Sequence, residues 1–218
     1  MGMFIFRYII NFLRNIRINR ICRKYGIENY VINKDGSIDV DDTVYLSYRK
    51  LYRLPLKFNK VSGSFNCYRN YLTSLEGCPN YVGRNFYCEN NKLTSLEGCP
   101  SYVGISFNCS CNELTSLIGC PKEVGGYFDC QSNYLTSLDG CPKEEYSSLY
   151  SILTNPIYEV VVIFDNIKIY LDYQETYNFL RKDSKIVKHR LDEAIKDYNE
   201  YYNKNIRLPK SFYRYVYI

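Results

Sequence analysis

Residues 86–100 read Phe-Tyr-Cys-Glu-Asn-Asn-Lys-Leu-Thr-Ser-Leu-Glu-Gly-Cys-Pro, and close copies of this stretch recur every 21 residues along the 218-residue chain. The regular copies begin at Phe65, Phe86, Phe107 and Phe128. A degenerate copy lies one period upstream and starts at Val44. A fixed period of this length is typical of a solenoid, in which each unit buries its apolar face against its neighbours. The sequence therefore predicts a stack of repeats rather than a single compact core.

Alternation within one copy predicts a short strand. Phe86 and Cys88 alternate with Tyr87 and Glu89, so the first pair is expected to point inward and the second pair outward. Asn91 is expected to turn inward, where its amide can satisfy backbone groups of the turn. The predicted structural ladder consists of Phe65, Cys67, Asn70, Phe86, Cys88, Asn91, Phe107, Cys109, Asn112, Phe128, Cys130 and Asn133. Proline closes each copy, so turns or extended chain, and not full helices, are expected on the return.

The run Phe-x-Cys-x-x-Asn-x-Leu resembles the leucine-rich-repeat signature Leu-x-Leu-x-x-Asn/Cys-x-Leu. The segments LTSLEGCP and VGxxFxC are similar, more specifically, to short 21-residue repeats in proteins encoded by large viruses and phages, whose function is not established. The resemblance covers residues 44–142. It implies a leucine-rich-repeat solenoid with one parallel β-sheet. Together with an N-terminal helix and hairpin cap and a C-terminal helical cap, which the residues outside the repeats predict, the expected fold class is α+β. One departure is that the first leucine of the motif falls on Ser62, Gly83, Gly104 and Gly125. The entry to each strand is therefore expected to be offset.

Both ends of the chain lack the repeat. Residues 1–29 predict a basic amphipathic helix with Ile5, Ile9, Phe12, Leu13 and Ile16 on one face. Residues 30–43 predict a β-hairpin, with Asp35-Gly36 in its turn, that covers the first strand edge. Residues 143–218 predict a mainly helical cap, with helices starting near 155, over 174–182 and over 183–202. In the last of these helices, the residues expected to face the interior are Ile186, Leu191, Ala194, Ile195 and Tyr198.

Charge and motif content exclude several classes of function. Most of the net charge of +5 lies in residues 1–33, and the repeats are nearly neutral, which argues against a nucleic-acid reader. The chain has one histidine, and we find no acid–base pair, phosphate loop or nucleophile elbow, so neither an enzyme nor a cofactor is expected. Arg7 interrupts the first apolar stretch, which argues against a secretory signal and favours a cytoplasmic protein, in the host cytoplasm if viral.

Eight of the ten cysteines form two columns with the 21-residue period, and they lack the paired spacing that zinc sites need. The columns are Cys67, Cys88, Cys109 and Cys130, and Cys78, Cys99, Cys120 and Cys141. We expect buried thiols that pack as small apolar side chains, and no metal site. Cys111 lies outside both columns and is the thiol most expected to be exposed.

The outward strand face is the predicted binding surface, because its columns vary between copies while the inward columns are fixed. We expect a protein partner, from a host cell if the chain is viral, to contact the following residues: Tyr45, Ser47, Asn66, Tyr68, Tyr87, Glu89, Asn108, Ser110, Asp129 and Gln131. One alternative is a membrane-surface adaptor anchored through Arg7, Arg14, Arg17, Arg20, Arg23 and Lys24. Another is a structural component of a viral particle. The same helix could instead cap the solenoid, and the oligomeric state is left open.

Overall fold

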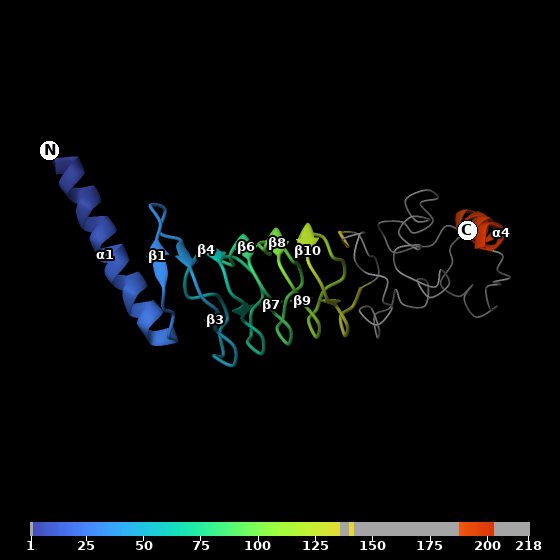
Figure 1. Ribbon diagram of the computed structural model, residues 1–218, viewed down its shortest axis with the longest axis horizontal. Helices are drawn as coiled ribbons and strands as arrows, with labels where there is room; N and C mark the ends of the chain where they lie inside the picture. The colour runs from blue at the N-terminus through green and yellow to red at the C-terminus, as the bar shows by residue number, and fades with distance from the viewer. Residues whose placement is uncertain (1, 136–139, 142–187, 203–218) are drawn as a thin grey trace.

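The computed structural model describes residues 2–135, 140–141 and 188–202. It is a repeat solenoid of about four 21-residue turns, whose coils stack along the long axis of the molecule (Figure 1). The described part contains two helices, α1 (Gly2–Tyr25) and α4 (Lys188–Tyr202). The predicted repeat architecture is confirmed.

The Phe-x-Cys segments form the predicted parallel sheet. Its strands are β3 (Val44–Tyr45), β5 (Phe65–Asn66), β7 (Phe86–Tyr87), β9 (Phe107–Asn108) and β11 (Phe128–Asp129). Each residue pairs with the residue one period away, as Phe86 does with Phe107. We call the side of this sheet that carries Tyr45, Tyr87 and their alternate neighbours the outward face.

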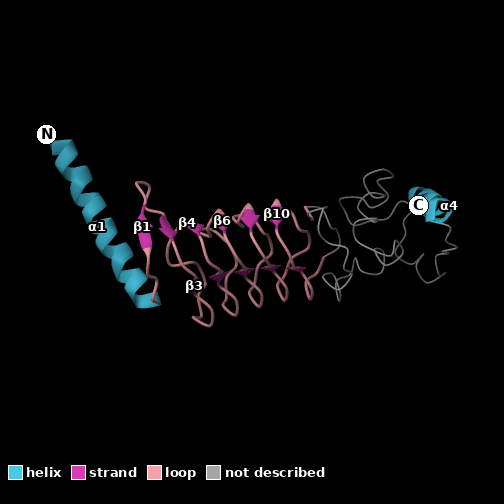
Figure 2. Cartoon of the chain, in the orientation of Figure 1, coloured by secondary structure: helices cyan, strands magenta, loops and turns pink. Residues whose placement is uncertain are grey.

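A second parallel sheet runs along the return side of the coils. It contains β4 (Phe58–Val61), β6 (Tyr81–Val82), β8 (Tyr102–Val103) and β10 (Glu123–Val124). The extended chain expected on this side is therefore long enough to pair, and Figure 2 shows the two rows of strands. The hairpin strands β1 (Tyr30–Ile32) and β2 (Ile38–Val40) extend this second sheet, because β2 pairs in parallel with β4.

The corner between the two sheets explains the missing leucine of the repeat motif. Gly83, Gly104 and Gly125 lie directly after the second-sheet strands, where successive coils touch through their backbones. A Cβ on Gly104 would lie 2.2 Å from the carbonyl oxygen of Gly83, which is too close for any side chain. This position of the repeat is therefore a close-packed corner between coils, where a leucine side chain would not fit.

The interior is built from stacked columns of identical residues. Phe86 and Phe107 are fully buried, and their rings stack with centroids 5.6 Å apart. Cys88 and Cys109 are also fully buried beside them. The inward direction predicted for the phenylalanine and cysteine columns is thus confirmed.

The asparagine column forms a ladder of buried hydrogen bonds. Asn91 Nδ2 donates to the carbonyl oxygens of Cys67 (3.1 Å) and Cys88 (3.0 Å), and its Oδ1 accepts the amide N–H of Leu72 at 3.0 Å. Asn112 repeats this pattern one coil further on, so that Cys88 O also accepts from Asn112 Nδ2 at 3.1 Å. Each asparagine therefore ties two coils together through groups that water does not reach.

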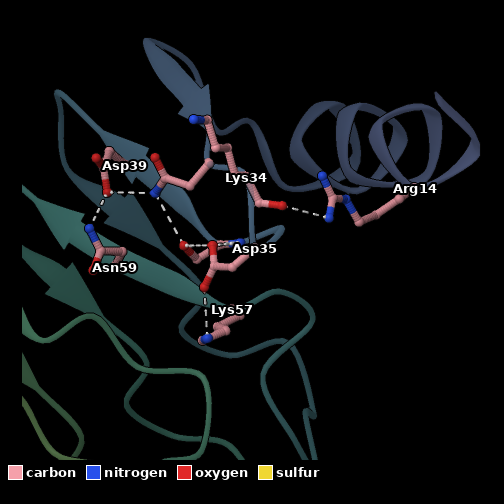
Figure 3. A network of polar contacts seen from close by, with 8 residues as sticks. Arg14, Lys34, Asp35, Asp39, Lys57 and Asn59 are labelled. Atoms are coloured by element: carbon pink, nitrogen blue, oxygen red, sulfur yellow. Dashed lines mark hydrogen bonds and ion pairs between the residues drawn. The ribbon is translucent and has the colours of Figure 1, made fainter. Parts of the chain in front are cut away.

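Polar contacts fasten the hairpin to the first coil (Figure 3). The Asp35 carboxylate accepts from Ser37 N, Ser37 Oγ and Lys57 Nζ, at 3.0, 2.6 and 2.9 Å. These donors hold the pKa of Asp35 well below its usual range. Asp39 Oδ1 accepts from Asn59 Nδ2 of β4 at 2.7 Å. The hairpin is thus held at the end of the second sheet, as a cap on its first strand edge.

The predicted C-terminal cap is described only in part. Helix α4 confirms the predicted helix over its described span, and Leu191, Ala194, Ile195 and Tyr198 are buried as expected. Ile186 and the two earlier predicted helices lie outside the described residues.

Candidate protein-binding face

The structure brings the ten predicted binding residues onto one continuous side of the first sheet, because strands β3 to β11 pair in register. Their accessibility differs. Tyr45 is 65% exposed, whereas Asn66 and Ser110 are each only 7% exposed. The remaining seven are half-buried: Ser47, Tyr68, Tyr87, Glu89, Asn108, Asp129 and Gln131. The face is therefore a partly covered surface and not a row of freely solvated side chains.

Polar side chains on the later strands accept hydrogen bonds from residues of their own strand segment. Asn108 Oδ1 accepts from Ser110 N (2.9 Å) and Ser110 Oγ (2.7 Å), which folds the serine back onto the strand and buries it. Asp129 Oδ1 accepts from Gln131 N at 2.9 Å in the same way. Because these contacts already engage the polar groups, this end of the face has fewer hydrogen-bonding atoms left for a partner.

The earlier strands leave polar atoms without such partners. Among the described residues, Asn66 Oδ1, Glu89 Oε2 and Ser47 Oγ are buried and have no hydrogen-bond partner. A buried acceptor without a donor costs about 1–3 kcal/mol. Three such atoms lie on neighbouring strand segments, within one stretch of the face. We call this stretch, with Tyr45, Tyr68 and Tyr87 beside it, the acceptor cluster.

Aromatic rings border the acceptor cluster. Tyr68 packs edge-on against Tyr48, with ring centroids 5.4 Å apart, and the Arg69 guanidinium lies 5.4 Å from the Tyr48 ring. These contacts fix Tyr68 in place beside Glu89. Tyrosine and arginine are among the residue types enriched at protein-binding hot spots.

Burial shifts the acidity of the carboxylates on the face. Desolvation raises the pKa of Glu89, with a smaller contribution from the charge of Asp129. Desolvation also raises the pKa of Asp129, and its hydrogen bond from Gln131 opposes the shift. A cation placed on this face would stabilise both charged forms.

The cysteines offer little chemistry. Burial raises the pKa values of Cys88, Cys109 and Cys130 well above the usual range, and that of Cys141 to about 12, so these thiols are poor nucleophiles. Cys111 is exposed, as predicted. In the part of the chain that the structure describes, no group of three or more histidine, cysteine, aspartate or glutamate side chains is arranged to hold a metal ion.

Sequence reasoning missed a cationic groove between α1 and the first coil. The groove has a volume of about 990 Å³. Its charged lining residues are Arg17, Lys24, Lys50, Arg53, Lys57 and Glu76. The nearly zero net charge of the repeats as a whole does not reveal this feature. Its charged residues also come from separate segments, four from the first coils and two from the helix. The signal available in the sequence was the concentration of basic residues within residues 49–57.

Neither described helix combines the length and the apolar character needed to cross a bilayer. No protein-family model, curated protein or solved structure matches the chain.

Proposed function

We propose that this chain is a non-enzymatic protein-interaction module of the leucine-rich-repeat type, which binds a protein partner through the outward face. The acceptor cluster carries the proposal. Asn66 Oδ1 and Glu89 Oε2 are buried but unpaired in the described structure, and a partner that donates hydrogen bonds to them would remove their cost. Natural proteins retain such a cost chiefly at functional sites.

The chemistry of the cluster defines the kind of partner. Acceptor oxygens and a carboxylate form hydrogen bonds with N–H donors. A nearby cation would lower the raised pKa of Glu89 toward its usual value. Tyr45, Tyr68 and Tyr87 supply flat contact area around those acceptors. The expected partner segment is therefore an extended peptide that carries arginine or lysine beside apolar groups.

The resemblance of the repeats to those encoded by large viruses supports a further part of the proposal, namely a viral protein that acts on a host protein in the host cytoplasm. The ten free cysteines agree with a reducing compartment.

Selection from a random peptide library displayed on phage, against the immobilised chain, tests the binding face. We expect enriched peptides to contain arginine or lysine. Their affinity should fall at least about tenfold for the N66V/E89Q variant, because loss of charge-assisted hydrogen bonds costs about 1.5–3 kcal/mol each. The variant should fold, since N66V removes one unpaired buried acceptor and E89Q removes a half-buried charge.

Tyr134→Ser provides the matched control. Tyr134 is 62% exposed and follows Asn133, beyond the columns that form the outward face, so this change should leave peptide binding intact. Equal affinity for the chain and for N66V/E89Q, or loss of binding only in Tyr134→Ser, would show that the face is wrongly assigned.

A further inference from the structure

Helix α1 presents its apolar stripe away from the solenoid. Ile9, Phe12, Leu13 and Ile16 share one side at i, i+3, i+4 and i+7, and they are between 48% and 58% exposed. Phe6 is 66% exposed near them. An apolar side of this size on a surface helix marks a place of interaction.

The opposite side of the helix is the one that docks. Ile18 is 5% exposed and Cys22 is fully buried. Ile18 follows Ile9 by nine residues, about 2.5 turns at ~3.6 residues per turn, so the two side chains point in opposite directions. Arg14 Nη1 donates to Lys34 O at 3.0 Å, which fixes this side against the hairpin tip (Figure 3). Docking therefore leaves the apolar stripe uncovered by the described residues.

Cations continue the exposed side of α1. Arg20 and Lys24 follow Ile9 and Leu13 by eleven residues, about three turns, so they lie on the side of the stripe. No acidic residue occurs before Glu28. The cationic groove extends this charge onto the solenoid through Lys50 and Arg53, whereas Lys57 is paired with Asp35. One side of the molecule is thus apolar at the beginning of α1 and positively charged at its end.

We propose that α1 binds the surface of an anionic phospholipid bilayer, with the apolar stripe among the acyl chains and Arg20, Lys24 and the cationic groove at the headgroups. This pairing satisfies both halves of the exposed side, since lipid tails match the stripe and lipid phosphates match the cations. A second copy of the chain does not. A second copy offers the stripe a matching apolar surface but gives Arg20 and Lys24 no anionic partner, because no acidic residue precedes Glu28.

Sedimentation with vesicles tests the proposal. The full chain should pellet with vesicles of mixed phosphatidylcholine and phosphatidylserine, and not with phosphatidylcholine alone. The stripe variant I9Q/L13Q should lower the partition coefficient by about 100-fold or more, because it removes two buried apolar side chains. The charge variant R20E/K24E should lower it by about 30-fold or more at low salt.

The variants change exposed residues, and unchanged thermal unfolding would show that they fold. Ile118→Gln is the matched control, because Ile118 is 58% exposed but lies on the solenoid, and its binding should equal that of the parent. Failure of the parent chain to pellet with anionic vesicles would overturn the proposal, as would full binding by I9Q/L13Q. Binding to vesicles or single-stranded RNA that only R20E/K24E abolishes would indicate polyanion capture instead. A dimer that I9Q/L13Q converts to monomer, without vesicle binding, would assign the stripe to a second copy.

Discussion

Replacing Asn91 with alanine should show how strongly the asparagine ladder holds neighbouring coils together. The change leaves the Leu72 amide N–H without its acceptor, at a cost of about 1–3 kcal/mol. It also removes one donor from each of the Cys67 and Cys88 carbonyls, which keep a second asparagine donor, so each loss costs about 0.5–1.5 kcal/mol. The expected total is about 2–6 kcal/mol, a large part of the stability of a domain this size.

Urea unfolding followed by circular dichroism measures this loss. Asn80→Ala is the control, because Asn80 is exposed and its described hydrogen bonds involve only its backbone; its stability should change by less than about 0.5 kcal/mol. Asn91→Asp should destabilise more than alanine at neutral pH, since it sets a buried carboxylate against two carbonyl oxygens. Burial raises the pKa of such a carboxyl, so this variant should regain stability as the pH falls. A loss below about 1 kcal/mol for Asn91→Ala would refute the ladder as a major source of stability.

Three further changes probe the corner, the face and the thiols. Gly104→Ala should cost about 1–3 kcal/mol or more in urea unfolding, because its Cβ would lie 2.2 Å from the Gly83 carbonyl oxygen of the preceding coil; a neutral result would contradict the close corner. Glu89→Gln should raise stability at neutral pH. Because its pKa is raised, Glu89 contributes less to the free energy of unfolding as the pH rises from about 4.5. The difference in stability between the variant and the parent should therefore shrink in acid. A stability difference that does not change with pH would count against the buried carboxylate. A colorimetric thiol titration of the native chain should show one fast-reacting group, which Cys111→Ser removes; several fast groups would mean that the cysteine columns are open.

The solenoid could be predicted because its inward residues obey one local rule in every copy. Phe86, Cys88 and Asn91 occupy fixed positions in a short alternating run, and each points inward for a reason that the sequence contains. The second sheet was not predicted, because Tyr81-Val82 is too short to show alternation. Its pairing arises only when coils stack at the glycine corner.

The candidate sites needed information from several coils. Asn108 Oδ1 finds its donors in Ser110, two residues further along the same copy, whereas Asn66 Oδ1, which is followed by Tyr68, has no partner among the described residues. The direction of α1 was equally hidden. An apolar stripe ordinarily packs against its own domain, but here the Ile18 and Cys22 side takes that place. The cationic groove joins residues that are more than 20 positions apart.

Hydroxyl-radical footprinting of the chain with a selected peptide would test the binding face most directly. We predict that Tyr45, Tyr68 and Tyr87 become protected from oxidation when the peptide is bound, whereas Tyr52 and Tyr134, both exposed and outside the face, react as before. Protection at Tyr52 or Tyr134, with the three face tyrosines unchanged, would contradict it.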